Sequence, residues 1–125
     1  MDGEGEFYFD VSNKMVHLVS SKKPQDGEIM MAVNKTLIYG DNAAPVTFTG
    51  VSFEYASVET ASCFAGGCSG QSADFLTTAA VTVHGSDGWR FENCAFAHVG
   101  GYAVWFGPNT TNSVLQQSHI YDVGA

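Results

Sequence analysis

An internal repeat is the feature that most constrains how this chain of 125 residues can fold. Two large apolar positions recur in three stretches, occupied by Phe48, Phe91 and Leu115 and by Phe53, Phe96 and Ile120. Phe91 and Leu115 are 24 residues apart, whereas Phe48 and Phe91 are 43 residues apart. We interpret the longer interval as one repeat that carries an insertion between Val58 and Thr78.

A short apolar segment precedes each of these stretches, at residues 37–39, 81–83 and 104–106. Repeats of 20 to 30 residues built from short alternating strands are typical of solenoids. We found no segment with the pattern of a helix. The sequence therefore predicts an all-β fold, a right-handed parallel β-helix of about three coils over residues 28–125.

The N-terminal segment has a different pattern. Two apolar runs, residues 5–10 and 15–19, flank the polar residues Ser12–Lys14, and a polar stretch that contains Pro24 follows. Apolar runs on either side of a short polar turn are typical of a hairpin. We expect residues 1–27 to form a β-hairpin and a loop.

Strand alternation predicts which residues of the coils face inward. Gly50, Asn93 and Gln117 separate the second and third strands of successive coils. Gly and Asn tolerate the left-handed backbone that a sharp bend requires, and Gln fits it less well. With these bends, the inward rows are Phe48, Phe91 and Leu115; Val51, Cys94 and Ser118; and Phe53, Phe96 and Ile120.

Composition and charge exclude several classes of protein. The chain is 45% hydrophobic and 14% charged, which excludes intrinsic disorder. Its net charge of -8 opposes binding to phosphate backbones, so we expect no nucleic-acid partner. No apolar run is long enough for a membrane span, and the acidic N-terminus is unlike a signal peptide.

The repeats also resemble a known group of proteins. The resemblance is carried by Gly5–Asp10, Val46–Glu54, Arg90–Gly100 and His119–Ala125. These segments resemble the front coils of the β-helix domain of glycoside hydrolase family 141-like proteins, in the pectate-lyase-like superfamily. The resemblance implies an extracellular or secretory location and a polysaccharide or glycan as partner. Its motifs are specific for the β-helix and weakly specific for activity.

Domains of that superfamily continue for many coils, whereas this sequence stops where a further coil would begin. An open solenoid end exposes apolar residues and unpaired strand edges. Three expectations stay open: a fragment of a longer protein, a truncated gene product, or self-association through the open C-terminal coil.

By the same resemblance, the outward face of the first strands is the substrate groove. We place Ile38, Thr82 and Trp105 on that face, with Thr82 and Trp105 as substrate-binding candidates. The indole of Trp105 offers a flat apolar surface on which a sugar ring can stack. The alternative is an aromatic that packs against a neighbouring turn or under the insertion.

Candidates for catalysis lie on the third strand and at its exit, at Asp122, His98 and His119. His98 and Asp122 are equivalents one coil apart, so we expect an Asp–His contact. The alternative to a catalytic role for this contact is a hydrogen bond that stabilises a turn. Glycoside hydrolysis requires two carboxyl groups about 5 to 9 Å apart, and no stacked pair is evident. The family's catalytic acids match no residue of this sequence.

Neither a metal nor a cofactor is expected. Cys63 and Cys68 are spaced to close a small disulfide loop, or they are free thiols, as is Cys94. Arg90, the one arginine, is interpreted as a solvated surface residue.

Two classes of function remain. The first is a fragment of a polysaccharide-degrading enzyme, a glycoside hydrolase rather than a polysaccharide lyase, whose active site is incomplete in this chain. The alternative is a non-catalytic β-helix that serves as a surface or carbohydrate-binding module.

Overall fold

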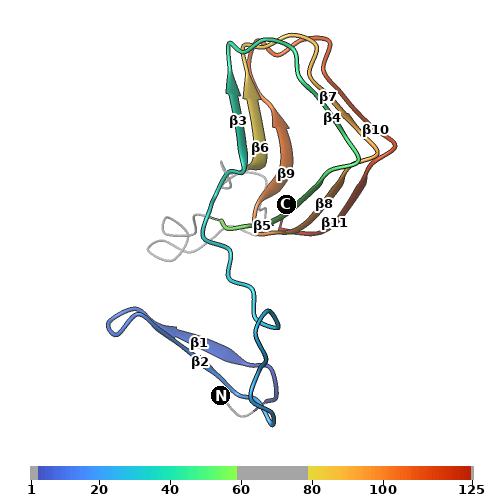
Figure 1. The fold of residues 1–125 in the computed structure, drawn as a ribbon. Helices are drawn as coiled ribbons and strands as arrows, with labels where there is room; N and C mark the ends of the chain where they lie inside the picture. The colour runs from blue at the N-terminus through green and yellow to red at the C-terminus, as the bar shows by residue number, and fades with distance from the viewer. Residues whose placement is uncertain (1–2, 59–78, 125) are drawn as a thin grey trace. The chain divides into compact units, whose positions relative to one another are not determined.

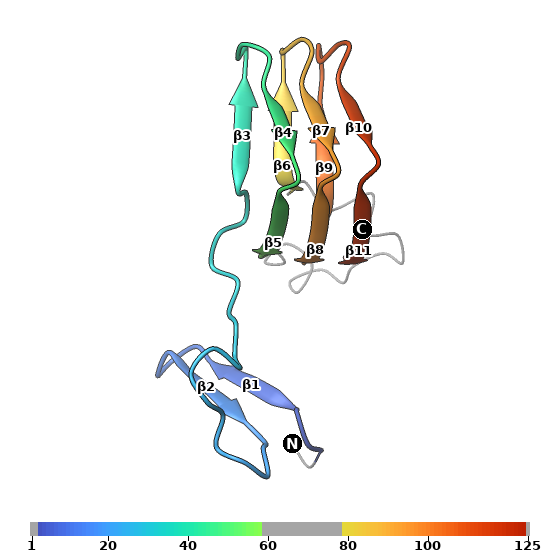
Figure 2. The same ribbon diagram turned by 45° about the vertical axis from the view of Figure 1, so that its right-hand side comes forward.

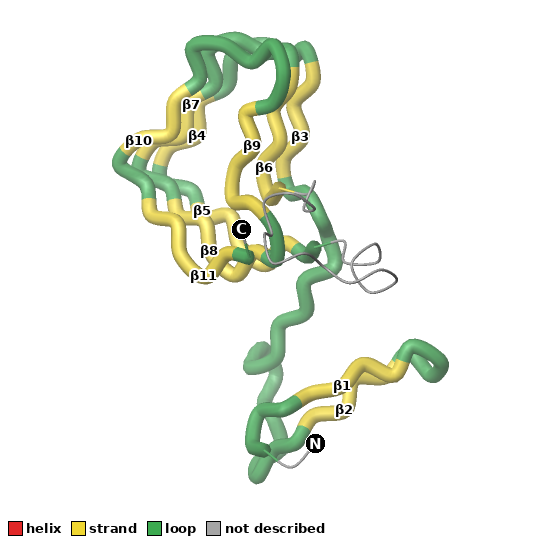
Figure 3. The backbone as a smooth tube through the Cα atoms, turned by 180° about the vertical axis from the view of Figure 1, so that it is seen from behind, coloured by secondary structure: helices red, strands yellow, loops and turns green. Residues whose placement is uncertain are grey.

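The computed structural model describes residues 3–58 and 79–124, and these contain strands and no helix (Figure 3). The chain divides into two compact units, one ending at Met30 and the other beginning at Met31. The predicted insertion, with Cys63 and Cys68, lies almost entirely outside the described residues.

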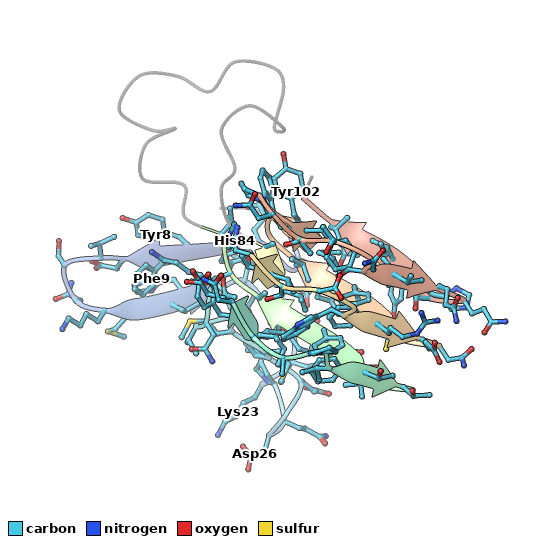
Figure 4. The ribbon with its side chains drawn as sticks, turned by 90° about the horizontal axis from the view of Figure 1, so that it is seen from above. Tyr8, Phe9, Lys23, Asp26, His84 and Tyr102 are labelled. Carbon is cyan, nitrogen blue, oxygen red and sulfur yellow. The ribbon has the colours of Figure 1, made fainter. Side chains whose placement is uncertain are left out.

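The first unit contains an antiparallel hairpin of β1 (Phe7–Asp10) and β2 (Met15–Leu18), as the sequence predicts. The Asp10 carboxylate accepts hydrogen bonds from the amide nitrogens of Ser12 and Asn13, at 2.9 and 3.0 Å, and so holds the turn. Successive side chains alternate between the faces of a strand, so Tyr8 and Phe9, labelled in Figure 4, belong to opposite faces of β1.

The second unit is built from three parallel sheets of three strands each (Figure 1). Every passage of the chain, which we call a coil, contributes one strand to each sheet, so that equivalent strands lie side by side (Figure 2). The sheets are β3 (Ile38–Asp41), β6 (Ala79–His84) and β9 (Tyr102–Phe106); β4 (Thr47–Thr49), β7 (Arg90–Glu92) and β10 (Val114–Gln116); and β5 (Ser52–Ala56), β8 (Ala95–Val99) and β11 (His119–Val123).

The strand register confirms the alignment of the repeats. Phe91 pairs with Phe48 on one side and Leu115 on the other, and Phe96 pairs with Phe53 and Ile120. Equivalent residues of neighbouring coils therefore form rows at the strand spacing of about 4.8 Å. Like apolar side chains stack because each row places them next to one another.

Burial is deepest in the middle coil. Phe91, Phe96 and Cys94 are almost fully buried, because a coil covers them on either side. Two residues predicted to lie in inward rows are more exposed than that prediction implies: Val51 is 38% exposed and Ile120 48%. Both belong to coils that have one described neighbour rather than two.

The bends between the second and third strands adopt the predicted left-handed conformation. The φ angles of Gly50, Asn93 and Gln117 are 68°, 53° and 50°. Side chains in these corners hold neighbouring coils together, since the Ser118 hydroxyl accepts a hydrogen bond from the Cys94 amide and donates one to the Gln116 carbonyl. Gln117 thus adopts the same left-handed conformation as Gly50 and Asn93, although glutamine has a poor propensity for it.

One sequence-based placement is wrong. Ile38 does not lie in the outward row with Thr82, because it pairs with the fully buried Val81 and packs against the core. The residue in that row is Tyr39.

The part of the chain that the structure describes contains no helix that is long and apolar enough to cross a membrane.

Candidate functional site

The sheet of β3, β6 and β9 presents an outward row of Tyr39, Thr82 and Trp105. Tyr39 is 65% exposed and Trp105 38%, with the smaller Thr82 between them. Two strand spacings place the flanking positions about 10 Å apart. The row therefore combines two aromatic surfaces with a polar gap between them.

Neighbouring rings fix these two aromatic residues. The Tyr102 ring meets the Trp105 indole edge-on, with centroids 5.4 Å apart, and the His84 ring lies 6.1 Å from that of Tyr39. Figure 4 labels His84, at the carboxyl end of β6, and Tyr102, at the amino end of β9. Each exposed aromatic side chain is thus restrained by a second ring.

The predicted candidates Thr82 and Trp105 are adjacent in this row, and the sequence analysis missed Tyr39. The signal was present, because Tyr39 precedes Thr82 by the same 43 residues that separate Phe48 from Phe91. Aligning the centres of the apolar segments placed Ile38 there instead.

A second group of residues lies on the sheet of β5, β8 and β11. Tyr55, His98 and Asp122 occupy equivalent positions of successive coils, and their φ angles are 60°, 53° and 51°. The His98 Nδ1 lies 2.6 Å from the Asp122 Oδ2, which confirms the expected contact. The Tyr55 ring stacks on the His98 ring, with centroids 5.0 Å apart and planes inclined by 18°.

This group borders a surface hollow of about 500 Å³. His98 and Asp122 line the hollow together with small residues that follow the third strands, among them Ser57, Gly100 and Gly124. A Cβ atom on Gly124 would overlap the Gly100 carbonyl oxygen, so glycine allows these two coils to approach closely at this point. The pair thus lies beside a space that the described residues leave open.

The third catalytic candidate, His119, is not part of this group. It begins β11 and pairs with Ala95, three residues before the position of Asp122. Tyr121 is closer, since its ring meets the His98 ring edge-on at 6.1 Å. The structure therefore brings together His98 and Asp122 and adds Tyr55 and Tyr121, which sequence reasoning did not link to them.

Two further charged residues, Arg90 and Asp87, form surface contacts. The Arg90 guanidinium lies 2.8 Å from the Glu92 carboxylate, which also accepts a hydrogen bond from the Gln116 amide at 3.0 Å. Elsewhere, hydrogen bonds from Thr111 and Asn112 lower the pKa of Asp87 below its ordinary value of 3.8. Residues 3–58 and 79–124 contain no group of three or more metal-ligating side chains.

Comparisons of the chain with protein-family models, with curated proteins and with solved structures found no match.

Proposed function

We propose that residues 31–124 are coils of a right-handed parallel β-helix, and that they belong to a carbohydrate-active protein which binds a glycan on the sheet of β3, β6 and β9. The stacked rows of equivalent residues support the β-helix, since a solenoid of three-strand coils requires them. The row of Tyr39, Thr82 and Trp105 supports the glycan.

The chemistry of this row fits a sugar chain. An aromatic ring packs its flat face against the C–H groups of a sugar, and two rings on one face can hold two residues of an extended glycan. The Thr82 hydroxyl offers a hydrogen-bond donor and acceptor between them. The net charge of -8 favours a neutral glycan over an acidic one.

A glycoside hydrolase is the enzyme class that the resemblance implies. Within strands β3, β6 and β9, Asp41 is the one acidic residue. Hydrolysis with two carboxyl groups would therefore need a second acid from outside these three strands. We propose glycan binding as the activity of this face itself, and a hydrolase as the protein to which it belongs.

Binding to insoluble neutral polysaccharides tests the proposal. The chain should sediment with at least one of cellulose, xylan and mannan, and Trp105→Ala should weaken that binding about tenfold through loss of the stacking surface. Tyr8→Ala, which removes an aromatic residue 57% exposed on the hairpin, is the matched control and should bind normally. No sedimentation with any of the three, or equal losses in both variants, would contradict the proposal.

Release of reducing sugar from the bound polysaccharide tests the enzyme class separately. Binding accompanied by hydrolysis supports the glycoside hydrolase. Binding without hydrolysis is expected both of a non-catalytic carbohydrate-binding module and of a hydrolase whose active site is incomplete in this chain.

A further inference from the structure

The row of Tyr55, His98 and Asp122 differs from the other positive-φ positions of the second unit. Elsewhere in the described coils those positions are filled by Gly, Asn and Gln. Tyr is strained in this conformation, because its Cβ atom crowds the backbone, whereas His adopts it more readily. Backbone strain of this kind is found where a side chain must be held in a particular place. The identity of Tyr55 therefore needs an explanation beyond the bend itself.

Contacts on three sides fix the His98 imidazole. The Tyr55 ring covers one face, Tyr121 meets the ring edge-on, and the Asp122 carboxylate binds Nδ1 at 2.6 Å. A carboxylate at Nδ1 holds the proton on that nitrogen in the neutral ring, which leaves Nε2 as a hydrogen-bond acceptor. Among the described residues, nothing occupies Nε2.

The glycine amides that line the hollow beside this ring are already paired. The amide nitrogens of Gly100 and Gly124 already donate to the carbonyls of Ala56 and Val99, both at 2.9 Å. An oxyanion hole needs free amide donors, so these two amides do not provide one. The polar side chains of the lining are those of Ser57, His98 and Asp122, and the side chains of His98 and Asp122 are 41% and 70% exposed. The geometry therefore favours binding over catalysis.

We propose that this hollow binds a neutral polyol through two neighbouring hydroxyl groups, as a single sugar residue would provide. One hydroxyl donates to His98 Nε2 and the other to the Asp122 carboxylate, and both residues line the hollow. An anion would meet the Asp122 charge. An ammonium ion would compete with His98 for the same carboxylate. This site is separate from the glycan face and does not depend on it.

Imidazole ¹⁵N NMR of the full chain tests the proposal, with methyl β-glucoside as the probe. The signal of His98 is assigned by its loss in His98→Asn, a residue that tolerates the backbone conformation. We expect the His98 Nε2 signal to shift and saturate below about 100 mM probe, while His17 and His119 do not respond. Asp122→Asn should weaken binding about tenfold.

Several outcomes would overturn the site. They are no His98 shift up to about 100 mM methyl β-glucoside, equal binding by Asp122→Asn with an unchanged circular dichroism spectrum, or a shift caused by ethylammonium and not by the glucoside. Trp105→Ala separates this site from the glycan face. If that variant loses polysaccharide binding and keeps the His98 response to the glucoside, the chain has two sites. If it loses both polysaccharide binding and the His98 response, the hollow is not a separate site.

Discussion

The ring of Phe91 lies parallel to that of Phe48, with centroids 5.2 Å apart and planes inclined by 9°. The two residues belong to neighbouring coils, and Phe53 and Phe96 meet the Phe91 ring edge-on. The Phe106 ring of the third coil lies 6.3 Å from it, so a single side chain contacts residues of three coils and three sheets. The interior of the second unit is organised around it.

Phe91→Ala should lower the free energy of unfolding by about 3–5 kcal/mol, because it leaves a cavity in a fully buried aromatic cluster. Tyr39→Ala, at an exposed position of the same unit, should change it by less than about 1 kcal/mol. Urea unfolding followed by tryptophan fluorescence measures both values. Similar losses in the two variants would contradict the central role of Phe91.

Gln117→Gly should stabilise the protein by about 1 kcal/mol, because glycine adopts a φ of 50° without the crowding that Gln suffers. The adjacent Gln116→Gly should do the opposite, since Gln116 lies in β10 and its amide bonds to Glu92. Melting temperatures of the two variants show the difference in sign. A destabilising Gln117→Gly would mean that the Gln side chain contributes more than its strain costs.

Ser86→Ala should cost about 1–3 kcal/mol of unfolding free energy. The buried Ser86 hydroxyl accepts a hydrogen bond from the Ala43 amide at 3.0 Å and donates one to the His84 carbonyl at 2.8 Å. Its loss leaves that amide without its acceptor. Ser52→Ala, at the exposed start of β5, is the control and should stay within about 0.5 kcal/mol in the same urea titration.

Protonation of Asp87 should lower the stability of the folded protein as the pH falls into the acid range. Hydrogen bonds from Thr111, and then from Asn112, lower the pKa of Asp87 in the folded protein below 3.8. A lowered pKa contributes stability above the unfolded value, which is lost as pH falls through the folded value. Melting temperatures between pH 7 and pH 2.5 should therefore fall less steeply below about pH 4 in Asp87→Asn than in the unmodified chain. Parallel curves would contradict this assignment.

Sequence reasoning located the rows formed by large side chains. Phe48 and Phe91, and Phe53 and Phe96, share one spacing and similar size, and the register places each pair side by side. The repeat also predicts the contact between His98 and Asp122, because equivalent positions of adjacent coils must meet. Sequence periodicity is sufficient to predict which residues lie side by side wherever the interval along the sequence between equivalent residues of two coils is constant.

The remaining features depend on conformation that periodicity does not report. Tyr55 stacks on His98 because both adopt a positive φ within a strand, a conformation that is uncommon for tyrosine. Alternation alone does not predict that conformation. Ile38 was misplaced by one residue, and a shift of one residue moves a side chain to the other face of a strand.

Parallel stacking has a consequence for protein engineering. Only Gly100 and Gly101 separate β8 from β9, whereas a far longer segment separates β5 from β6, yet all four strands keep their rows. The corner after the third strand therefore tolerates chains of very different length. Repeats of unequal length can therefore be joined at this corner without a change in strand register.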